Sequence, residues 1–322
     1  MPNPPLLMNA QIMPMIHRQL EAAFDVANAF DPATREQVIA EAGPRVEVLA
    51  TGGHHYMVDR ALIDRLPKLR IVSNFGVGYD GVDAAYCASK GIVVTNTPDV
   101  LTEEVADTAL GLLLMTVREL PQSEQYLRAG RWAKEGDYPL TKGSLRDRKV
   151  GMVGYGRIGQ AIAKRIEAFG VPVSYFARSK RDVPNTFYSD LVTMARDVDT
   201  LVIITPGGAG TKNLVNAEVL KALGPRGVVI NIARGTVVDE TALKAALRDG
   251  TIHAAGLDVM WGEPKIDPDL MTIPNLVLLP HVGSASVWTR DKMGQLVVDN
   301  ALSWKTKTPP LTPVPETPFK GW

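Results

Sequence analysis

Short apolar runs alternate with amphipathic stretches along most of this chain. The apolar runs are too short for helices and many are rich in Val and Ile, so they predict β-strands. The predicted strands cover residues 46–50, 70–73, 92–95, 150–153, 171–175, 200–204, 227–232, 254–257 and 276–279. Helical periodicity is clearest at 105–120, 158–169 and 241–248. Strands that alternate with helices predict βαβ units and mainly parallel sheets.

The pattern falls into two blocks, one on either side of a long helical segment from about residue 101 to residue 128. Pro121 should bend or break that segment, because proline lacks the amide hydrogen that an interior helical turn requires. A final apolar helix, about 287–304, precedes a proline-rich tail at 309–318, which we expect to be extended and packed on the surface. The pattern therefore predicts an α/β protein with two blocks of parallel sheet.

Composition narrows the class of protein. The length of 322 residues suggests two domains of ordinary size, and 45% hydrophobic with 22% charged residues is typical of globular chains. The 35 basic residues balance the 35 acidic ones, so the net charge gives no indication of binding to nucleic acid or to an acidic membrane surface. Cys87 is the one cysteine, which excludes an internal disulfide and a cysteine-based zinc cluster. With no signal-peptide pattern and no apolar run long enough to cross a membrane, a cytoplasmic protein is expected.

The strongest local motif follows the predicted strand at 150–153. Gly154, Gly156 and Gly159 form G-x-G-x-x-G, and a helical pattern begins directly after them. In this context the glycines permit a tight turn, a close approach to a diphosphate, and close packing of helix on strand. The free amides of the helix N-terminus then favour the anion. An ordinary glycine turn is the alternative, but the strand–turn–helix context favours a dinucleotide site.

The residues after the next predicted strand bear on the choice of cofactor. An acidic residue there would bind the ribose 2′-hydroxyl of NAD. This chain instead has Arg178, Ser179, Lys180 and Arg181, with no carboxylate before Asp182. These side chains suit a 2′-phosphate, so NADPH is the preferred cofactor, with NAD possible. The alternative is a basic turn that only faces solvent.

Three residues near predicted strand ends match the chemistry of keto-acid reduction. Arg234 could hold a substrate carboxylate and polarise its carbonyl, and His281 could deliver a proton to the developing alkoxide. Glu263 could fix the tautomer of the histidine and favour its protonated form. Each residue alone has a simpler explanation, such as an ion pair between Arg234 and Asp239. Together, and downstream of a dinucleotide motif, they favour catalysis.

Two glycine-containing loops follow strands of the first block. The loop at 74–83 could present backbone N–H groups to a carboxylate, and the loop at 51–55 could do the same. His54 and His55 are adjacent and point in different directions. Without matching acidic ligands, no metal site is expected there.

Taken together, the chain resembles the D-isomer-specific 2-hydroxyacid dehydrogenases from about residue 48 to residue 312. The motifs that carry the resemblance are the 74–83 loop, the Asn-Thr-Pro-Asp-Val-Leu-Thr segment at 96–102, the glycines at 154–159, Ala-Arg-Gly at 233–235, Gly-Leu-Asp-Val at 256–259 with Glu-Pro at 263–264, and Pro-His-Val-Gly-Ser at 280–284. The resemblance implies two Rossmann-like domains with parallel sheets and an active site in the interdomain cleft. Residues 1–99 and 288–322 would form the substrate-binding domain and residues 100–287 the dinucleotide-binding domain. It also implies a homodimer that meets through the helical segment after Thr97.

The resemblance also assigns roles to residues. Arg234, Glu263 and His281 would be the catalytic residues, and Asp258 would face the nicotinamide carboxamide. The expected cofactor-binding residues are Gly154, Gly156, Arg157, Ile158, Gly159, Arg178, Ser179, Lys180, Thr205, Pro206, Thr211, Ala233, Asp258, His281 and Gly283. The expected substrate-binding residues are Gly53, Val77, Gly78, Arg234, His281 and Trp288, and no metal is expected.

Within the family, the chain is similar to glyoxylate/hydroxypyruvate reductases and to hydroxyphenylpyruvate reductases. NADPH-dependent reduction of a small 2-keto acid to the D-2-hydroxyacid is therefore expected, with a hydroxyphenylpyruvate or phenylpyruvate reductase as the alternative. Met260-Trp261-Gly262, the loop at 206–210 and Trp288 depart from the usual pattern, which leaves the preferred substrate side chain open. A non-catalytic NAD(P)-sensing protein is a further alternative, which the intact trio disfavours. Glutamate rather than glutamine at position 263 disfavours a formate dehydrogenase.

Overall fold

The computed structural model describes residues 3–52 and 56–322. The expected substrate contact of Gly53 and the rejected metal site at His54 and His55 lie outside these residues. The chain divides into two compact units. Unit 1 comprises Met1–Leu101 and Ser286–Trp322, and unit 2 comprises Thr102–Ala285.

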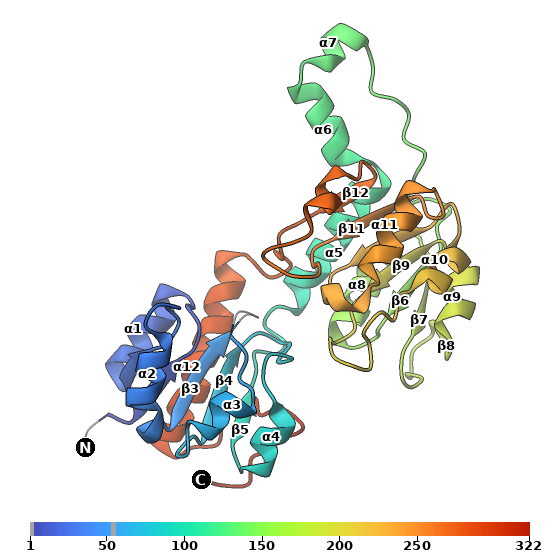
Figure 1. The fold of residues 1–322 in the computed structure, drawn as a ribbon. Helices are drawn as coiled ribbons and strands as arrows, with labels where there is room; N and C mark the ends of the chain where they lie inside the picture. The colour runs from blue at the N-terminus through green and yellow to red at the C-terminus, as the bar shows by residue number, and fades with distance from the viewer. Residues whose placement is uncertain (1–2, 53–55) are drawn as a thin grey trace. The chain divides into compact units, whose positions relative to one another are not determined.

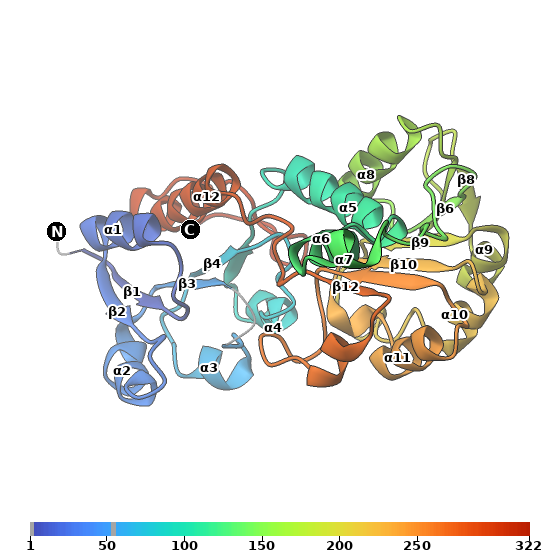
Figure 2. The same ribbon diagram turned by 90° about the horizontal axis from the view of Figure 1, so that it is seen from above.

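Unit 1 is built on a five-stranded parallel sheet with the strand order β2-β1-β3-β4-β5. The strands are β1 (Pro5–Met8), β2 (Asp25–Asn28), β3 (Val48–Gly52), β4 (Ile71–Phe75) and β5 (Val93–Thr95). One face carries α1 (Pro14–Ala23) and α12 (Val287–Thr306), and the other carries α2 (Arg35–Ala42), α3 (Arg60–Asp64) and α4 (Ala84–Ser89) (Figure 2). A short 3-10 helix, Gly43–Arg45, leads into β3. The two faces of the sheet therefore each have a separate apolar core.

Unit 2 is built on a seven-stranded parallel sheet with the order β12-β11-β10-β9-β6-β7-β8. Its strands are β6 (Val150–Val153), β7 (Val173–Phe176), β8 (Thr186–Tyr188), β9 (Thr200–Ile203), β10 (Val228–Asn231), β11 (Ala254–Leu257) and β12 (Leu276–Leu278). Its faces are covered by α5 (Thr102–Val117) and α8 (Arg157–Glu167) on one side, and by α9 (Leu191–Asp197), α10 (Ala217–Leu223) and α11 (Glu240–Arg248) on the other (Figure 2). Two 3-10 helices, Gly235–Val237 and Pro268–Thr272, complete it. Read from β8 to β11, the order is that of a doubly wound dinucleotide-binding sheet, whose order reverses between β6 and β9.

Two helices extend from unit 2 beyond its sheet. These are α6 (Leu120–Arg128) and α7 (Arg131–Glu135), which Figure 1 shows at the end of a projection from which the chain returns to β6. We call residues 118–143 the arm. The predicted break at Pro121 was wrong in position, because α5 and α6 separate at 118–119, where Glu119 has a left-handed φ of 52°. Pro121 lies in the first turn of α6, where a missing amide hydrogen costs nothing.

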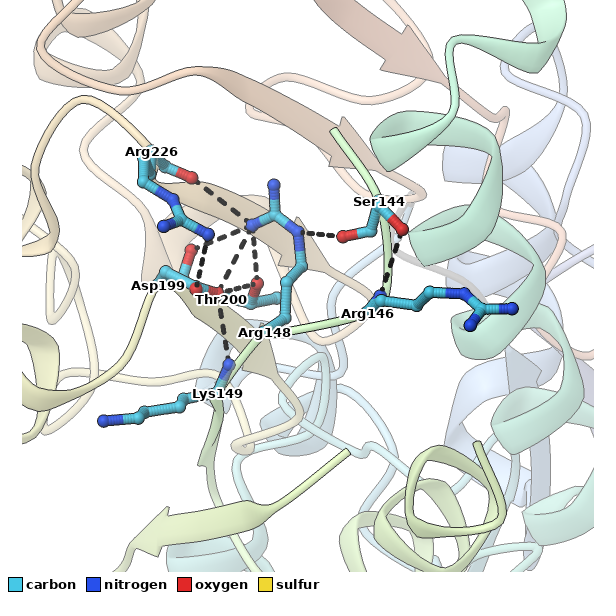
Figure 3. Close-up of polar contacts among 7 residues, drawn as sticks. All are labelled: Ser144, Arg146, Arg148, Lys149, Asp199, Thr200 and Arg226. Carbon is cyan, nitrogen blue, oxygen red and sulfur yellow. Dashed lines mark hydrogen bonds and ion pairs between the residues drawn. The ribbon is translucent and has the colours of Figure 1, made fainter. Parts of the chain in front are cut away.

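A buried arginine fastens the returning chain to the sheet. The Arg148 side chain is 4% exposed, and its guanidinium donates to Ser144 O at 3.0 Å and to Thr200 Oγ1 at 3.1 Å, with Asp199 Oδ1 at 3.3 Å (Figure 3). Arg226 O accepts a further hydrogen bond at 3.3 Å. Burial of a charge is costly unless its donors find acceptors, and here Nε and Nη1 of Arg148 both do. The network therefore ties the start of β6 to the start of β9.

All nine predicted strands are confirmed, and each predicted limit lies within two residues of the observed one. Three strands were missed: β1, β2 and β8. β2 and β8 are edge strands with exposed or half-exposed residues, so they lack the continuous apolar run of a central strand. β1 is four residues long and begins at Pro5.

The proline-rich tail is held more firmly than expected. Pro313 forms an antiparallel bridge with Thr95, and the side chains of Val314 and Thr317 are buried. The tail therefore adds to the edge of the unit 1 sheet at β5. Over the described residues, no helix combines the length and apolar character that crossing a bilayer requires.

Candidate active site

The turn between β6 and α8 has two glycines that the fold requires and one that it does not. Gly154 has a φ of 102°, and a Cβ atom there would lie 3.0 Å from the carbonyl carbon of Ile204. A Cβ on Gly159 would lie 2.7 Å from Gly154 O. A Cβ on Gly156 would meet nothing within 4 Å, so this glycine leaves open space at the N-terminus of α8. That space is where backbone amides and the helix dipole favour a phosphate group.

The neighbouring strand end offers a second polar group. Thr205 follows β9, and its Oγ1 is buried without a hydrogen-bond partner among the described residues. Its Cγ2 lies 3.1 Å from the position of a Gly154 Cβ, so this hydroxyl belongs to the same edge of the sheet. The open space and the unsatisfied hydroxyl at the point where strand order reverses fit a dinucleotide. Thr211 instead bonds its own loop, donating to Pro206 O at 2.7 Å.

The basic turn after β7 lies next to this edge, since β7 pairs with β6. Arg178, Ser179 and Lys180 are exposed there. Beneath them the backbone is held by the hydroxyl of buried Tyr175, which accepts from Arg181 N at 2.7 Å. The turn therefore has a defined backbone conformation and exposes the cations of Arg178 and Lys180 and the hydroxyl of Ser179.

His281 and Glu263 form a close pair. His281 Nδ1 lies 2.7 Å from Glu263 Oε2, and Glu263 Oε1 accepts from Met260 N at 2.6 Å. Both carboxylate oxygens are therefore held. His281 N donates to Asp258 O at 2.9 Å, and the residue has a left-handed φ of 54°. A carboxylate beside Nδ1 favours the form of the imidazole that carries its hydrogen on Nδ1.

Arg234 follows β10 in a turn that Asn231 shapes. Asn231 is fully buried, its Nδ2 donates to Arg234 O at 2.9 Å, and its Oδ1 accepts from Ala233 N at 3.1 Å. Arg234 Nη1 donates to Ala233 O at 2.7 Å. Sequence reasoning missed Asn231, although a buried asparagine at the end of an apolar strand is a signal for a shaped turn.

Asp258 has a structural role that the motif alone did not reveal. Its side chain is 1% exposed and accepts from Val282 N at 2.7 Å and from Gly283 N at 2.9 Å. Burial raises the pKa of this carboxyl group, and the two N–H donors act in the opposite direction. Asp258 thus anchors the turn that carries His281. Its predicted contact with the cofactor stays a prediction.

In unit 1, the 76–78 loop has every carbonyl engaged. Asn74 Nδ2 donates to Gly76 O at 3.3 Å and to Gly78 O at 3.1 Å, and Asn96 Nδ2 donates to Val77 O at 2.8 Å. No partner is recorded within the described residues for the N–H groups of Val77 and Gly78. Among the described residues, these two amide N–H groups therefore stay without a backbone acceptor, as the predicted binding of an anion requires. Trp288, also in unit 1, is 67% exposed in the first turn of α12.

Several known proteins are similar to this chain in sequence and in fold. Residues 110–283 match the sequence profile of the D-isomer specific 2-hydroxyacid dehydrogenase NAD binding domain. A hydroxyphenylpyruvate reductase of Plectranthus scutellarioides is 43% identical and a glyoxylate/hydroxypyruvate reductase A of Arabidopsis thaliana is 42% identical, each over 310 residues that cover 96% of this chain and 98% of the relative. The solved structure of an NADPH-dependent glyoxylate/hydroxypyruvate reductase from Sinorhizobium meliloti, in complex with NADP and malonate, is 50% identical with a TM-score of 0.91. That match covers 99% of this chain and 98% of the other.

Proposed function

Because this chain belongs to the D-isomer specific 2-hydroxyacid dehydrogenase family, a family of oxidoreductases, we propose that it reduces a small 2-keto acid of the glyoxylate or hydroxypyruvate type to the D-2-hydroxyacid with NADPH. The observation that carries the proposal is the His281–Glu263 pair, 2.7 Å apart, in the same unit as Arg234 and the dinucleotide turn. Unit 2 is then the dinucleotide-binding domain and unit 1 the substrate-binding domain.

The residues divide the chemistry between them. Bound NADPH supplies the hydride that reaches the keto carbon. His281 Nε2 gives its proton to the oxygen that becomes the hydroxyl group, while Glu263 accepts the Nδ1–H hydrogen bond and stabilises the imidazolium. Arg234 binds the carboxylate and polarises the carbonyl. The amides of Val77 and Gly78 bind the carboxylate as well, and Trp288 contributes to the choice of substrate side chain.

The exposed turn after β7 supports the choice of NADPH over NADH. Arg178 can bind a 2′-phosphate through its planar guanidinium, with Ser179 and Lys180 as further donors. Gly154, Gly156 and Gly159 accommodate the diphosphate, and the buried Oγ1 of Thr205 is available to the same ligand. Arg157 and Ile158 supply the first helical turn beside it.

A second substrate class has its own support. The relative from Plectranthus is named for hydroxyphenylpyruvate, and Trp288 is exposed where an aromatic substrate could stack. The test is the initial rate of NADPH and of NADH oxidation with glyoxylate, hydroxypyruvate, pyruvate, phenylpyruvate and hydroxyphenylpyruvate. Turnover of the small acids with NADPH would support the proposal. Turnover of the aromatic acids alone would show that the substrate is an aromatic 2-keto acid instead. NADPH binding without turnover of any of them would favour a cofactor-sensing protein.

The arm supports assembly as a homodimer. It exposes Leu120, Leu127, Trp132 and Leu140, with Leu140 97% exposed. A hollow of about 290 Å³ lies among Tyr126, Leu127, Trp132 and Tyr138. Exposed apolar side chains concentrated on a projection are typical of a surface that a second copy covers. A cytoplasmic location is part of the proposal and rests on the sequence alone.

A further inference from the structure

Glu240 is the first residue of α11, and its Oε2 accepts from Trp261 N at 3.1 Å. We propose that this contact makes Glu240 a positioning residue, which holds the loop after β11 in the shape that the His281–Glu263 pair requires. The inference rests on the proposed function, since it assigns Glu240 to the same reaction. Glu240 itself touches neither His281 nor Glu263 in any recorded contact, so it would act through Trp261.

Trp261 is held at two points by one short segment. Besides its backbone N–H, its indole Nε1 donates to Val238 O at 2.9 Å. Val238 lies two residues before Glu240, between the 3-10 helix Gly235–Val237 and α11, so both donors of Trp261 bond to one short stretch of chain. Two bonds at different points fix both the position of the residue and the orientation of its peptide plane.

The peptide bond between Met260 and Trp261 lies next to the Met260 N–H group, which orients Glu263. Met260 precedes Trp261, and its own N–H donates to Glu263 Oε1 at 2.6 Å. Glu263 Oε2 meets His281 Nδ1 at 2.7 Å. Because a carboxylate is planar, a shift of the Met260 amide would rotate the oxygen that faces the histidine. The orientation of Glu263 therefore depends on how firmly the 260–261 segment is held.

The same segment supports the turn that carries Arg234. A Cβ on Gly235 would lie 2.1 Å from Met260 C and 2.5 Å from Trp261 N, so the two backbones are in direct contact. Burial raises the pKa of Glu240, while the Trp261 N–H and the Lys244 charge lower it. A partly desolvated carboxylate makes a stronger hydrogen bond than an exposed one. Glu240 is thus placed to stabilise the 260–261 segment, which contacts both the Glu263 carboxylate and the turn that carries Arg234.

The test compares Glu240→Ala with Glu240→Gln, which keeps an acceptor oxygen. Glu218→Ala is the matched control, because Glu218 is an exposed carboxylate in the first turn of α10. We expect Glu240→Ala to lower kcat by about 10-fold to 100-fold, the range that small misplacement of catalytic groups produces. NADPH affinity should stay within about 2-fold of wild type, because the diphosphate turn follows a different strand. A lower kcat at an unchanged NADPH affinity separates misplaced catalytic groups from a general loss of structure. Glu240→Gln and Glu218→Ala should behave like wild type.

A second readout does not depend on turnover. The chemical shifts of the His281 imidazole, followed by NMR at one pH, should change in Glu240→Ala and stay in place in Glu240→Gln. Unchanged imidazole shifts and an unchanged kcat in folded Glu240→Ala would overturn the inference, and so would a loss of activity explained wholly by a smaller folded fraction. If Glu240→Ala does not fold, Trp261→Phe removes the indole donor, together with part of the ring, and should change the same resonances to a smaller extent. Failure of the wild type to reduce any 2-keto acid would count against the proposed function, while the imidazole resonances would still decide the role of Glu240.

Discussion

Glu263 Oε2 lies 2.7 Å from His281 Nδ1, although the two residues follow different strands of the unit 2 sheet. The contact exists because β11 and β12 are parallel neighbours, which brings the loops at their carboxyl ends together. A carboxylate in this place favours the tautomer of the imidazole that carries its hydrogen on Nδ1.

Replacing His281 by alanine removes the proposed proton donor. We expect kcat to fall by about 10²-fold to 10⁴-fold, the usual contribution of general acid catalysis. NADPH affinity, measured by fluorescence titration, should change little, because the diphosphate turn follows a different strand. Turnover close to the wild-type rate would exclude His281 as the acid.

Replacing Arg178 by aspartate should reverse the cofactor preference. The change removes a charge-assisted contact to the 2′-phosphate, so kcat/KM with NADPH should fall by about 10-fold to 100-fold while the value with NADH is kept or rises. Arg196→Asp is the control, since Arg196 is an exposed cation in the last turn of α9. Equal effects of the two variants would show that only overall charge matters.

Gly156→Ala separates cofactor binding from folding. The new Cβ meets no protein atom within 4 Å, so the melting temperature should stay near that of wild type. The methyl group would occupy the space proposed for the diphosphate, and NADPH should bind at least about 10-fold more weakly. Gly111→Ala, in the middle of α5 and equally open, should leave NADPH affinity unchanged.

Charges on the arm should disrupt the proposed dimer. The double variant Leu127→Glu, Trp132→Glu places two carboxylates on apolar surface that is 55% and 58% exposed in the single chain. Light scattering should report a monomer, while Phe169→Glu, at an exposed apolar residue outside the arm, should remain dimeric. A wild-type monomer at micromolar concentration would refute the dimer directly.

His253 should make stability depend on pH. Burial lowers the pKa of His253 and the charge of Arg148 lowers it further, so the folded state binds this proton less readily than the unfolded state. As the pH falls below about 6.5, His253 gains a proton in the unfolded chain but not yet in the folded one. The free energy of unfolding therefore decreases from that pH down to the lower pKa that His253 has in the folded state. His253→Gln should lose less stability between pH 7 and pH 5, as measured by urea unfolding. Parallel pH dependence in both proteins would contradict the prediction.

Local chemistry was enough to predict a large part of this protein. The central strands are dense in β-branched residues, and the glycines at 154, 156 and 159 act within one strand–turn–helix unit, so neither depends on distant contacts. Arg234, Glu263 and His281 became candidates because parallel strands place functional residues at their carboxyl ends, and their catalytic roles stay predictions.

Tertiary structure alone decided how those residues are held. Asn231 shapes the Arg234 turn, and Asp258 binds the amides after His281 across 24 and 25 residues of sequence. Glu240 reaches Trp261 across 21 residues. Such contacts depend on the strand order, on the loop conformation and on which polar groups become buried away from water. No local pattern in the chain encodes any of these three. For the same reason the edge strands β2 and β8 were missed, since partial burial leaves their sequences without the apolar run that marks a strand in the interior.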